Sequence, residues 1–345
     1  MKTCAREPGG QGRKAAFTMI GLLLVSAGSL HGAPECRVVP QPGNRASFVI
    51  GDIERLGWHF GPGYPRPFFY PFKSPLGTSL TRMGHPGAPD HDHHRSIWFA
   101  HADVAGNNFW TDGTEARIRQ KQWLVYGDGE KEAVMAVRLA WYDGEGRELM
   151  EQELVAAFVE DSQLGCQLEL QSRFVPAGET LELGKTNFGF LAVRMAKEFS
   201  GHFGGGVISD SEGRTGEKEI FGKRARWIDY SGPHSPEKKV QEGITYFDHP
   251  SNPRYPTYWH LREDGWMGAS FGLKEAFLLK RGEPLQLRYL LLGHARPVAR
   301  KSLDDLAAAF GERPAFEVTK STRPHRHFEV RRVPVAPRSE PSSKP

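Results

Sequence analysis

The strongest chemical signal in the sequence is a cluster of histidines. Five of the 14 histidines lie between positions 85 and 101, together with two aspartates and an arginine. Imidazoles and carboxylates gathered in this way can transfer protons or hold a metal ion. We therefore predict a catalytic group in and beside this stretch, consisting of Asp90, His93, His94, Arg95, His101 and Asp103.

Three interpretations of this cluster are open. The histidines could act as general acid and base on a polar small molecule, with Asp90 or Asp103 orienting one of them. Neutral imidazoles with a carboxylate could bind a transition metal, but no tight spacing on a defined element selects three ligands. The histidines could also be hydrogen-bonded structural groups that pack a loop. If 93–101 is a strand, His93 and His101 share one face of it.

Two proline-rich segments supply further binding candidates. Aromatic residues between prolines at 66–82, flanked by arginines, suit a rigid cleft wall, because rings stack on sugar faces and arginine binds carboxylates and hydroxyls. Three prolines likewise stiffen 248–260 and hold its polar groups for binding. Each segment could equally be a packed irregular loop. The predicted substrate-binding residues, including two tryptophans near the histidines, are Arg66, Tyr70, Trp98, Trp110, His249, Asn252, Arg254, Trp259 and His260.

Apolar and polar residues alternate with a period of two through much of the chain, which is typical of strands. Short Gly/Asp turns separate four of these stretches and predict an antiparallel meander at 116–126, 133–142, 148–159 and 164–174. Other strands are expected at 45–50, 96–101, 188–195, 268–272, 275–280 and 285–292, with long loops at 199–220 and 231–260. A helix is expected at 302–310, with Ser302 as its N-cap. The pattern predicts an all-β fold, a large antiparallel β-sandwich with one late α-helix.

The two ends of the chain differ from its body in charge. The formal net charge is +4, but residues 1–33 contribute +3 and residues 320–345 contribute +5, which leaves 34–319 at −4. An acidic body lacks the basic surface that a nucleic-acid backbone requires. We therefore expect no nucleic-acid partner, and the sequence does not predict an oligomeric state.

The ends also differ from the body in composition. A basic stretch, an apolar run and small residues are typical of a secretory signal, which we assign to 1–33. Residues 34–319 are expected to form a single β-sandwich domain, and 320–345, basic and rich in Pro and Ser, a mobile tail. No later stretch approaches 18 apolar residues, so we expect a secreted or periplasmic protein without a membrane span after the signal. Cys36 and Cys166 could form one disulfide in such a compartment.

Several long motifs resemble the PmoA-like family. In the family's order, across residues 45–295, they are RPFFYPF, PLGTSLTR, DHDHHRSIWFAH, NFGFLAVRMA, WIDYSG and DHPSNPRYPTYWH. The family carries the name methane oxygenase, which implies an integral membrane protein, and this sequence lacks such spans. The resemblance therefore implies an exported bacterial β-sandwich protein with a carbohydrate-related context. The chain departs from the family pattern at Ala105, where the family has Asn.

The expected sandwich is also similar to the galactose-mutarotase-like supersandwich, in which histidines and carboxylates act on sugars by proton transfer. This likeness concerns the fold and says little about function by itself.

Three functions follow from these observations. The sequence favours an exported carbohydrate-active enzyme of the epimerase, lyase or hydrolase type, with a small-molecule or oligosaccharide ligand. In it His94 or His101 would be general base or acid, and the arginines Arg66 and Arg95 would stabilise negative charge on an oxygen. The second is a non-catalytic glycan-binding module that uses the same cleft. The third is a metal-dependent oxidoreductase or hydrolase that uses the histidine cluster; no cofactor is assigned.

Overall fold

The fold is all-β, as the alternation predicts. Residues 35–85, 87–235 and 238–333 are described by a computed structural model of the chain, in which strand accounts for 53% and helix for 9%. The predicted signal at 1–33 lies outside the described residues. No helix of the described part is long and apolar enough to cross a membrane.

The first large sheet joins segments that are far apart in sequence. Its eight antiparallel strands run in the order β1-β2-β3-β4-β5-β11-β16-β15. Their bounds are β1 (Cys36–Gln41), β2 (Arg45–Ile50), β3 (Ile53–His59), β4 (Phe68–Phe72), β5 (Ile97–His101), β11 (Gly189–Arg194), β15 (Trp259–Arg262) and β16 (Trp266–Ala269). Because β11 pairs with both β5 and β16, the end of the histidine-rich stretch lies near the β15–β16 hairpin, which begins at the end of the proline-rich segment 248–260.

The second large sheet contains the predicted meander. Its order is β12-β13-β14-β18-β9-β8-β7-β6, again antiparallel throughout. The strands are β6 (Arg117–Gly127), β7 (Glu132–Tyr142), β8 (Glu148–Asp161), β9 (Gly165–Pro176), β12 (Val207–Asp210), β13 (Trp227–Ser235), β14 (Lys238–Asp248) and β18 (Leu285–His294). The long loop expected at 231–260 is therefore wrong, since β13 and β14 occupy much of it.

The remaining elements are short, except for one helix. The small strands pair as hairpin-like ribbons, β10 (Thr180–Leu183) with β17 (Phe277–Lys280) and β19 (Ala315–Lys320) with β20 (Phe328–Val333). The helices are η1 (Pro89–His91), η2 (Lys197–Phe199), α1 (Gly201–Gly204), α2 (Glu217–Ile220) and α3 (Arg300–Glu312). The late helix is α3. It begins at Arg300, two residues before the predicted N-cap Ser302, and Ala299 is the residue at its N-cap position.

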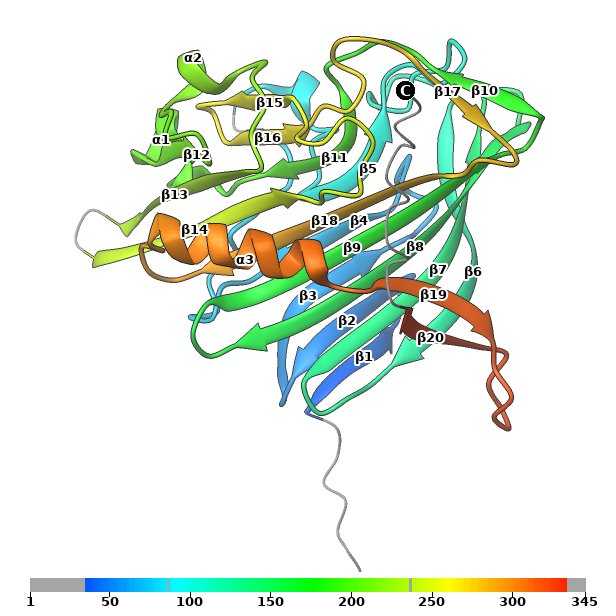
Figure 1. Cartoon of the computed structure of the whole chain (residues 1–345), viewed down its shortest axis with the longest axis horizontal. Helices are drawn as coiled ribbons and strands as arrows, with labels where there is room; N and C mark the ends of the chain where they lie inside the picture. Colours follow the sequence, from blue (N-terminus) through cyan, green and yellow to red (C-terminus); the bar gives the residue numbers. More distant parts are fainter. Residues whose placement is uncertain (1–34, 86, 236–237, 334–345) are drawn as a thin grey trace, which may run out of the picture. The chain divides into compact units, whose positions relative to one another are not determined.

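The main core lies between the two large sheets. Phe48 of β2 contacts Phe158 of β8 at 6.2 Å between ring centroids, and Phe99 of β5 contacts Phe174 of β9 at 6.3 Å. A second apolar cluster fixes α3 on the outer face of the second sheet through Leu303, Leu306 and Phe310 (Figure 1). The sandwich and its late helix are thus confirmed.

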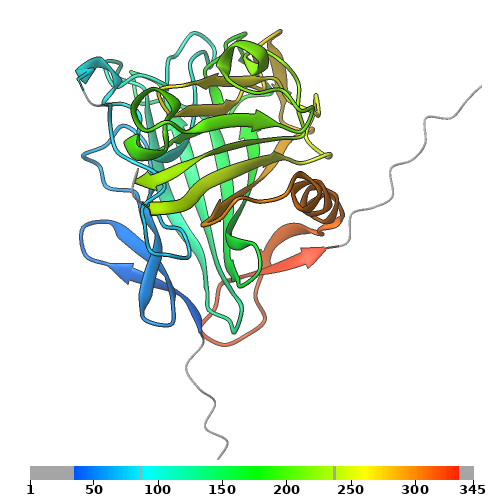
Figure 2. The same cartoon turned by 90° about the vertical axis from the view of Figure 1, so that its left-hand side faces the viewer.

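Two smaller sequence predictions differ from the structure. Strand β20 lies inside the segment predicted as a mobile tail, where it pairs with β19 on the same side of the molecule as α3 (Figure 2). The rest of that segment, 334–345, lies outside the described residues. Cys36 and Cys166 are both free and buried in the core, so the possible disulfide is not formed.

Candidate functional site

Strand β5 has two different faces. Ile97 and Phe99 point into the core between the sheets. Trp98 and Ala100 belong to a separate aromatic cluster with Trp110 and Trp266, on the opposite face of the first sheet. Because side chains alternate along a strand, this opposite face carries the site.

A pocket of about 430 Å³ lies over this face. It gathers groups from four segments: the loop before β5, the loop after it, the start of β11, and the β15–β16 hairpin. The lining residues are Asp90, His91, His93, His94, Ala102, Asn108, Trp110, Thr111, Phe188, His260, Arg262, Asp264 and Trp266. The structure therefore brings together five of the residues predicted from the sequence: Asp90, His93, His94, Trp110 and His260.

His93 and His260 are held in the same tautomer by backbone carbonyls. His93 Nδ1 lies 2.9 Å from the carbonyl oxygen of Asp90, and His260 Nδ1 lies 3.1 Å from that of Asn187. A carbonyl only accepts, so each Nδ1 carries the proton and each Nε2 keeps its lone pair. Burial lowers the pKa of His260 to about 4 and also lowers that of His93. Both rings are therefore neutral bases near pH 7.

His94 is held by ring stacking instead of hydrogen bonds. Its ring stacks on Trp98 at 5.6 Å and on Trp266 at 5.2 Å, and His93 meets it edge-on at 4.4 Å. Its buried Nδ1 has no hydrogen-bond partner among the residues that the structure describes, and an N–H there would be an unsatisfied donor costing about 1–3 kcal/mol. The proton therefore belongs on Nε2. Burial, with His93 and Arg194 nearby, lowers the pKa of His94 far below its ordinary value, so the ring stays neutral.

Aromatic rings connect these histidines into one wall. The His260 ring lies 5.6 Å from Trp266 and 5.1 Å from Phe188. Since His94 contacts Trp266 as well, both histidines lie against one indole. The histidine-rich stretch and the segment 248–260 therefore meet, as the cleft expected from the sequence requires. The indole Nε1 atoms of Trp98 and Trp266 are buried and, like His94 Nδ1, have no hydrogen-bond partner among the described residues.

The charged groups of the pocket are already paired. Asp264 receives Arg194 Nη1 at 2.8 Å and His85 Nε2 at 3.1 Å. Burial would raise the pKa of Asp264, but Arg194 and His85 lower it below its ordinary value. Arg262 forms an ion pair with Glu217. The uncharged polar groups that line the pocket are the imidazoles, Asn108 and Thr111.

The predicted arginines position loops instead of facing a ligand. Arg66 is buried and donates to the carbonyl oxygens of Phe109, at 3.0 Å, and of His93, at 3.2 Å. Arg66 and Arg95 both also donate to Asp112, a residue that the sequence prediction missed. Neither arginine lines the pocket, and the single carboxylate of Asp112 offsets one of their two charges, so their role in stabilising developing negative charge stays a prediction.

His101, Asp103 and Tyr70 do not line the pocket. His101 faces the core, where Nε2 bonds to the Gly184 carbonyl at 2.9 Å and the ring stacks on Phe190. The expected face shared by His93 and His101 does not exist, because β5 begins only at Ile97.

Asp103 accepts a hydrogen bond from the Gly106 amide in a tight turn. Asp90 bonds to His91 through its side chain and orients His93 only through its carbonyl. Tyr70 packs against the aromatic cluster that contains Trp98, Trp110 and Trp266.

Most of the predicted binding residues in the proline-rich segment 248–260 have structural roles. Trp259 is buried against Tyr246, and Arg254 donates to the carbonyl oxygens of Phe271 and Ala276. Asn252 bonds to Asp248 and to the backbone of Arg288. Only His260 of this segment reaches the pocket.

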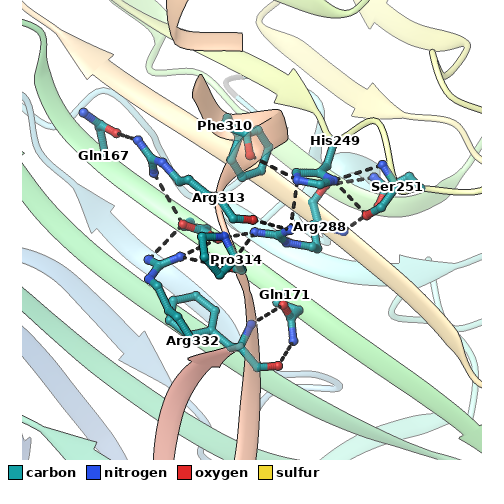
Figure 3. A network of polar contacts seen from close by, with 12 residues as sticks. Gln167, Gln171, His249, Ser251, Arg288, Phe310, Arg313, Pro314 and Arg332 are labelled. Atoms are coloured by element: carbon teal, nitrogen blue, oxygen red, sulfur yellow. Dashed lines mark hydrogen bonds and ion pairs between the residues drawn. The ribbon is translucent and has the colours of Figure 1, made fainter. Parts of the chain in front are cut away.

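His249 belongs to a different network, at the end of α3 (Figure 3). It bonds to Ser251 and to the Phe310 carbonyl, and Arg288 Nη1 lies 2.9 Å from its Nε2. It therefore lies outside the pocket.

Besides Asp112, the residues that the sequence prediction missed come from the β15–β16 hairpin and from β11. Asp264 lies in the run Glu263-Asp264-Gly265, which reads as an ordinary Asp-Gly turn, and Trp266 follows that turn at the start of β16. Arg194 lies in a strand with no nearby chemical motif.

For metals, the described residues contain no group of three His, Cys, Asp or Glu placed to hold an ion, so the metal interpretation has no ligand set there.

Comparisons with known proteins give a family and distant structural likenesses. The model of "Family of unknown function (DUF6807)" matches residues 45–308; the PmoA-like name has no support among the matches. A GalM/aldose epimerase homologue from C. elegans is 7% identical, with 77% of this chain and 100% of that chain covered and a TM-score of 0.32. YeaD from Salmonella typhimurium, assigned as a mutarotase, is 12% identical, with 75% and 93% covered and a TM-score of 0.32. No curated protein matches. Since these TM-scores are below 0.5, the residues of the site carry the functional inference.

Proposed function

Because the chain belongs to DUF6807, a family of unknown function, we propose its function from the pocket itself. The pocket binds a sugar or sugar derivative, and its histidines transfer a proton on that ligand. The observation that supports this most is the convergence of two uncharged histidines from distant segments, His94 and His260, on one tryptophan, Trp266, with His93 edge-on to His94. Export to the periplasm or medium remains part of the proposal, on the sequence alone.

The lining suits a neutral, hydroxylated ring. Trp110, Phe188 and Trp266 offer apolar faces on which the C–H faces of a sugar can stack. Hydroxyl groups both donate and accept, so they match the lone pairs of His93 and His260 and the Nε2–H of His94. Because Asp264 and Arg262 are paired with neighbouring residues, a charged ligand would gain no free counter-charge there.

The same groups can carry out proton transfer. His260 Nε2 is an unprotonated base at neutral pH, and its ring is oriented by the Asn187 carbonyl. His94 can donate from Nε2 to an oxygen on which negative charge develops. This division of roles favours epimerase or lyase chemistry over glycoside hydrolysis. Hydrolysis needs a pair of available carboxylates, and Asp264 is held by Arg194 and His85.

Proton NMR in D₂O tests this proposal. A panel of free aldoses, uronic acids and methyl glycosides is incubated with the protein. Anomer interconversion, exchange of a C–H for deuterium, and a new alkene proton report mutarotation, epimerisation and elimination respectively. Turnover of at least one sugar that His260→Gln abolishes and His249→Gln retains is the expected result. Saturation-transfer signals without any turnover would assign the pocket to a non-catalytic binding module, and no binding at all would contradict the proposal.

A further inference from the structure

A second hollow lies far from the histidine pocket along the chain, between strand β6 and the β19–β20 hairpin. It has a volume of about 680 Å³. One side is formed by residues 122–127 of β6, the edge strand of the second sheet, with Asp128 after it, and the other by residues 323–332. This β6–hairpin groove uses the basic segment near the C-terminus that the proposed function leaves without a role.

The hairpin is fixed to the sheet, so the groove is preformed. Gln171 of β9 donates to the Phe316 carbonyl at 2.7 Å and accepts from the Phe316 amide at 2.9 Å. Arg332 bonds to Glu132 and to the buried Glu169 (Figure 3). Phe316 and Phe328 pack with Leu124 beneath the groove. A ligand therefore binds without the entropic cost of ordering the β19–β20 hairpin.

The groove offers cations that the protein leaves unpaired. Arg331 and Arg332 are engaged with Glu317 and Glu169. The guanidinium groups of Arg323 and Arg326, in contrast, are exposed and have no hydrogen-bond or ion-pair partner in the described part of the chain. They lie in the loop at the tip of the hairpin. A planar guanidinium binds a carboxylate through two parallel hydrogen bonds.

The opposite side of the groove carries an aromatic platform. Trp123 and Tyr126 of β6 stack at 4.2 Å between centroids and 24° between planes. Phe60 meets Trp123 edge-on from the other sheet, and the Tyr126 side chain is 40% exposed. An exposed ring supported by a second ring is a surface on which a sugar can stack.

We propose that the β6–hairpin groove binds a polysaccharide of uronic acid units, with rings stacked on Tyr126 and carboxylates on Arg323 and Arg326. The spacing of charge favours this ligand over nucleic acid. Asp128, Glu132 and Glu329 also line the groove; they repel duplex DNA, with one charge per about 1.7 Å of axis, more than a polyuronate, which carries one charge per sugar unit. An acidic peptide would leave the aromatic platform unused. This binding is independent of the proton transfer proposed for the histidine pocket.

Affinity electrophoresis of the full chain in gels containing polygalacturonate tests the proposal, with dextran gels as the neutral reference. The variant Arg323→Gln/Arg326→Gln is expected to bind at least tenfold more weakly. The matched variant Lys274→Gln/Lys280→Gln removes the same charge outside the groove and is expected to bind within twofold of the wild type. Tyr126→Ala is expected to weaken binding two- to tenfold while leaving net charge unchanged.

Four outcomes would overturn the proposal. They are no retardation by polygalacturonate, equal losses in the two double variants, stronger binding to duplex DNA or polyglutamate than to polygalacturonate, and equal affinity for dextran sulfate. Dextran sulfate, run beside polygalacturonate, separates carboxylate recognition from general attraction to anions, because equal affinity for both would exclude the planar carboxylate contact. His260→Gln is expected to be retarded like the wild type, so this test fails or succeeds separately from that of the histidine pocket.

Discussion

Two polar clusters on opposite outer faces of the sandwich look alike in sequence and differ in structure. One is the histidine pocket on the first sheet, with His93, His94 and His260. The other is the network beneath α3 on the second sheet, where Glu169 accepts from three arginines: Arg288, Arg313 and Arg332. Both contain a histidine from the proline-rich segment 248–260.

The difference lies in the carboxylate and in access to a cavity. Both carboxylate oxygens of Glu169 are occupied, and Arg288 also reaches the Arg313 carbonyl and His249. Buried polar atoms without a partner in the residues described occur in both clusters, at His94 Nδ1 and at Arg288 Nε, so they do not separate the two. The engaged carboxylate and arginines stabilise the fold, whereas the imidazoles of His93, His94 and His260 line an open pocket and are available to a ligand. Residue type alone does not distinguish these two cases.

Replacing one histidine from each cluster sharpens the comparison most. His260→Gln is expected to lower kcat/KM on the sugar found by NMR by about 10²–10⁴-fold, because it removes the general base. His249→Gln, which alters the network beneath α3, is expected to keep activity within threefold when both are assayed well below their unfolding temperatures. Equal losses in the two variants would remove the functional distinction between the clusters.

Removing the charge at the centre of the network beneath α3 is expected to affect stability instead. Burial would raise the pKa of Glu169, but Arg332 and Arg288 lower it, so the carboxylate is ionised and compensates them. Glu169→Gln leaves buried cations short of a partner and is expected to cost about 3–5 kcal/mol in urea unfolding. Glu151→Gln, which breaks the half-exposed pair with Arg138, is expected to cost about 0–1 kcal/mol. Similar costs for both would contradict the structural role given to Glu169.

The pH dependence of turnover tests the burial of the pocket. The pKa of His260 is lowered to about 4 by burial, so its basic form persists above that pH and is lost as pH falls through it. The acid limb of kcat/KM is therefore expected near pH 4 and not near 6.5, the ordinary value for histidine. Circular dichroism at each pH confirms that the protein stays folded. An acid limb of kcat/KM near pH 6.5 would show that the general base is exposed to solvent and not buried.

The aromatic wall is expected to give the smallest effect. Phe188 is 38% exposed and meets both His260 and Trp110. Phe188→Ala removes a stacking face worth about 0.5–1.5 kcal/mol and is expected to raise KM two- to tenfold with kcat nearly unchanged. Leu278→Ala, at an exposed apolar position outside the pocket, serves as the control. A loss confined to kcat would mean that Phe188 positions the base and does not bind the ring.

The sequence predicts the sheets better than it predicts the site. Alternation and Gly/Asp turns are local signals, and they place β6 to β9 nearly as the structure has them. The loop predicted at 231–260 fails because β13 and β14 are buried strands whose alternation is interrupted by Gly, Pro and Asp.

The site depends on pairings that no local pattern contains. His249 and His260 are eleven positions apart in one proline-rich segment, but only β15 pairs into the first sheet beside β16 and β11. Asp112 and Asp264 are invisible in the sequence because their partners, Arg66 and Arg194, are 46 and 70 positions away. The histidine-rich stretch marks the region, and the sheet order decides which of its residues meet.

Histidine NMR tests the central claim most directly. In uniformly ¹⁵N-labelled histidine, long-range ¹H–¹⁵N spectra at pH 7 report the tautomer of each ring and its response to a sugar. The account predicts Nδ1–H forms for His93 and His260, an Nε2–H form for His94, and shifts of these three signals when a sugar from the panel is added. The signals of His101 and His249 are expected to stay in place. Shifts confined to His249, or no histidine shift with a sugar that binds, would contradict the assignment of this pocket as the ligand site.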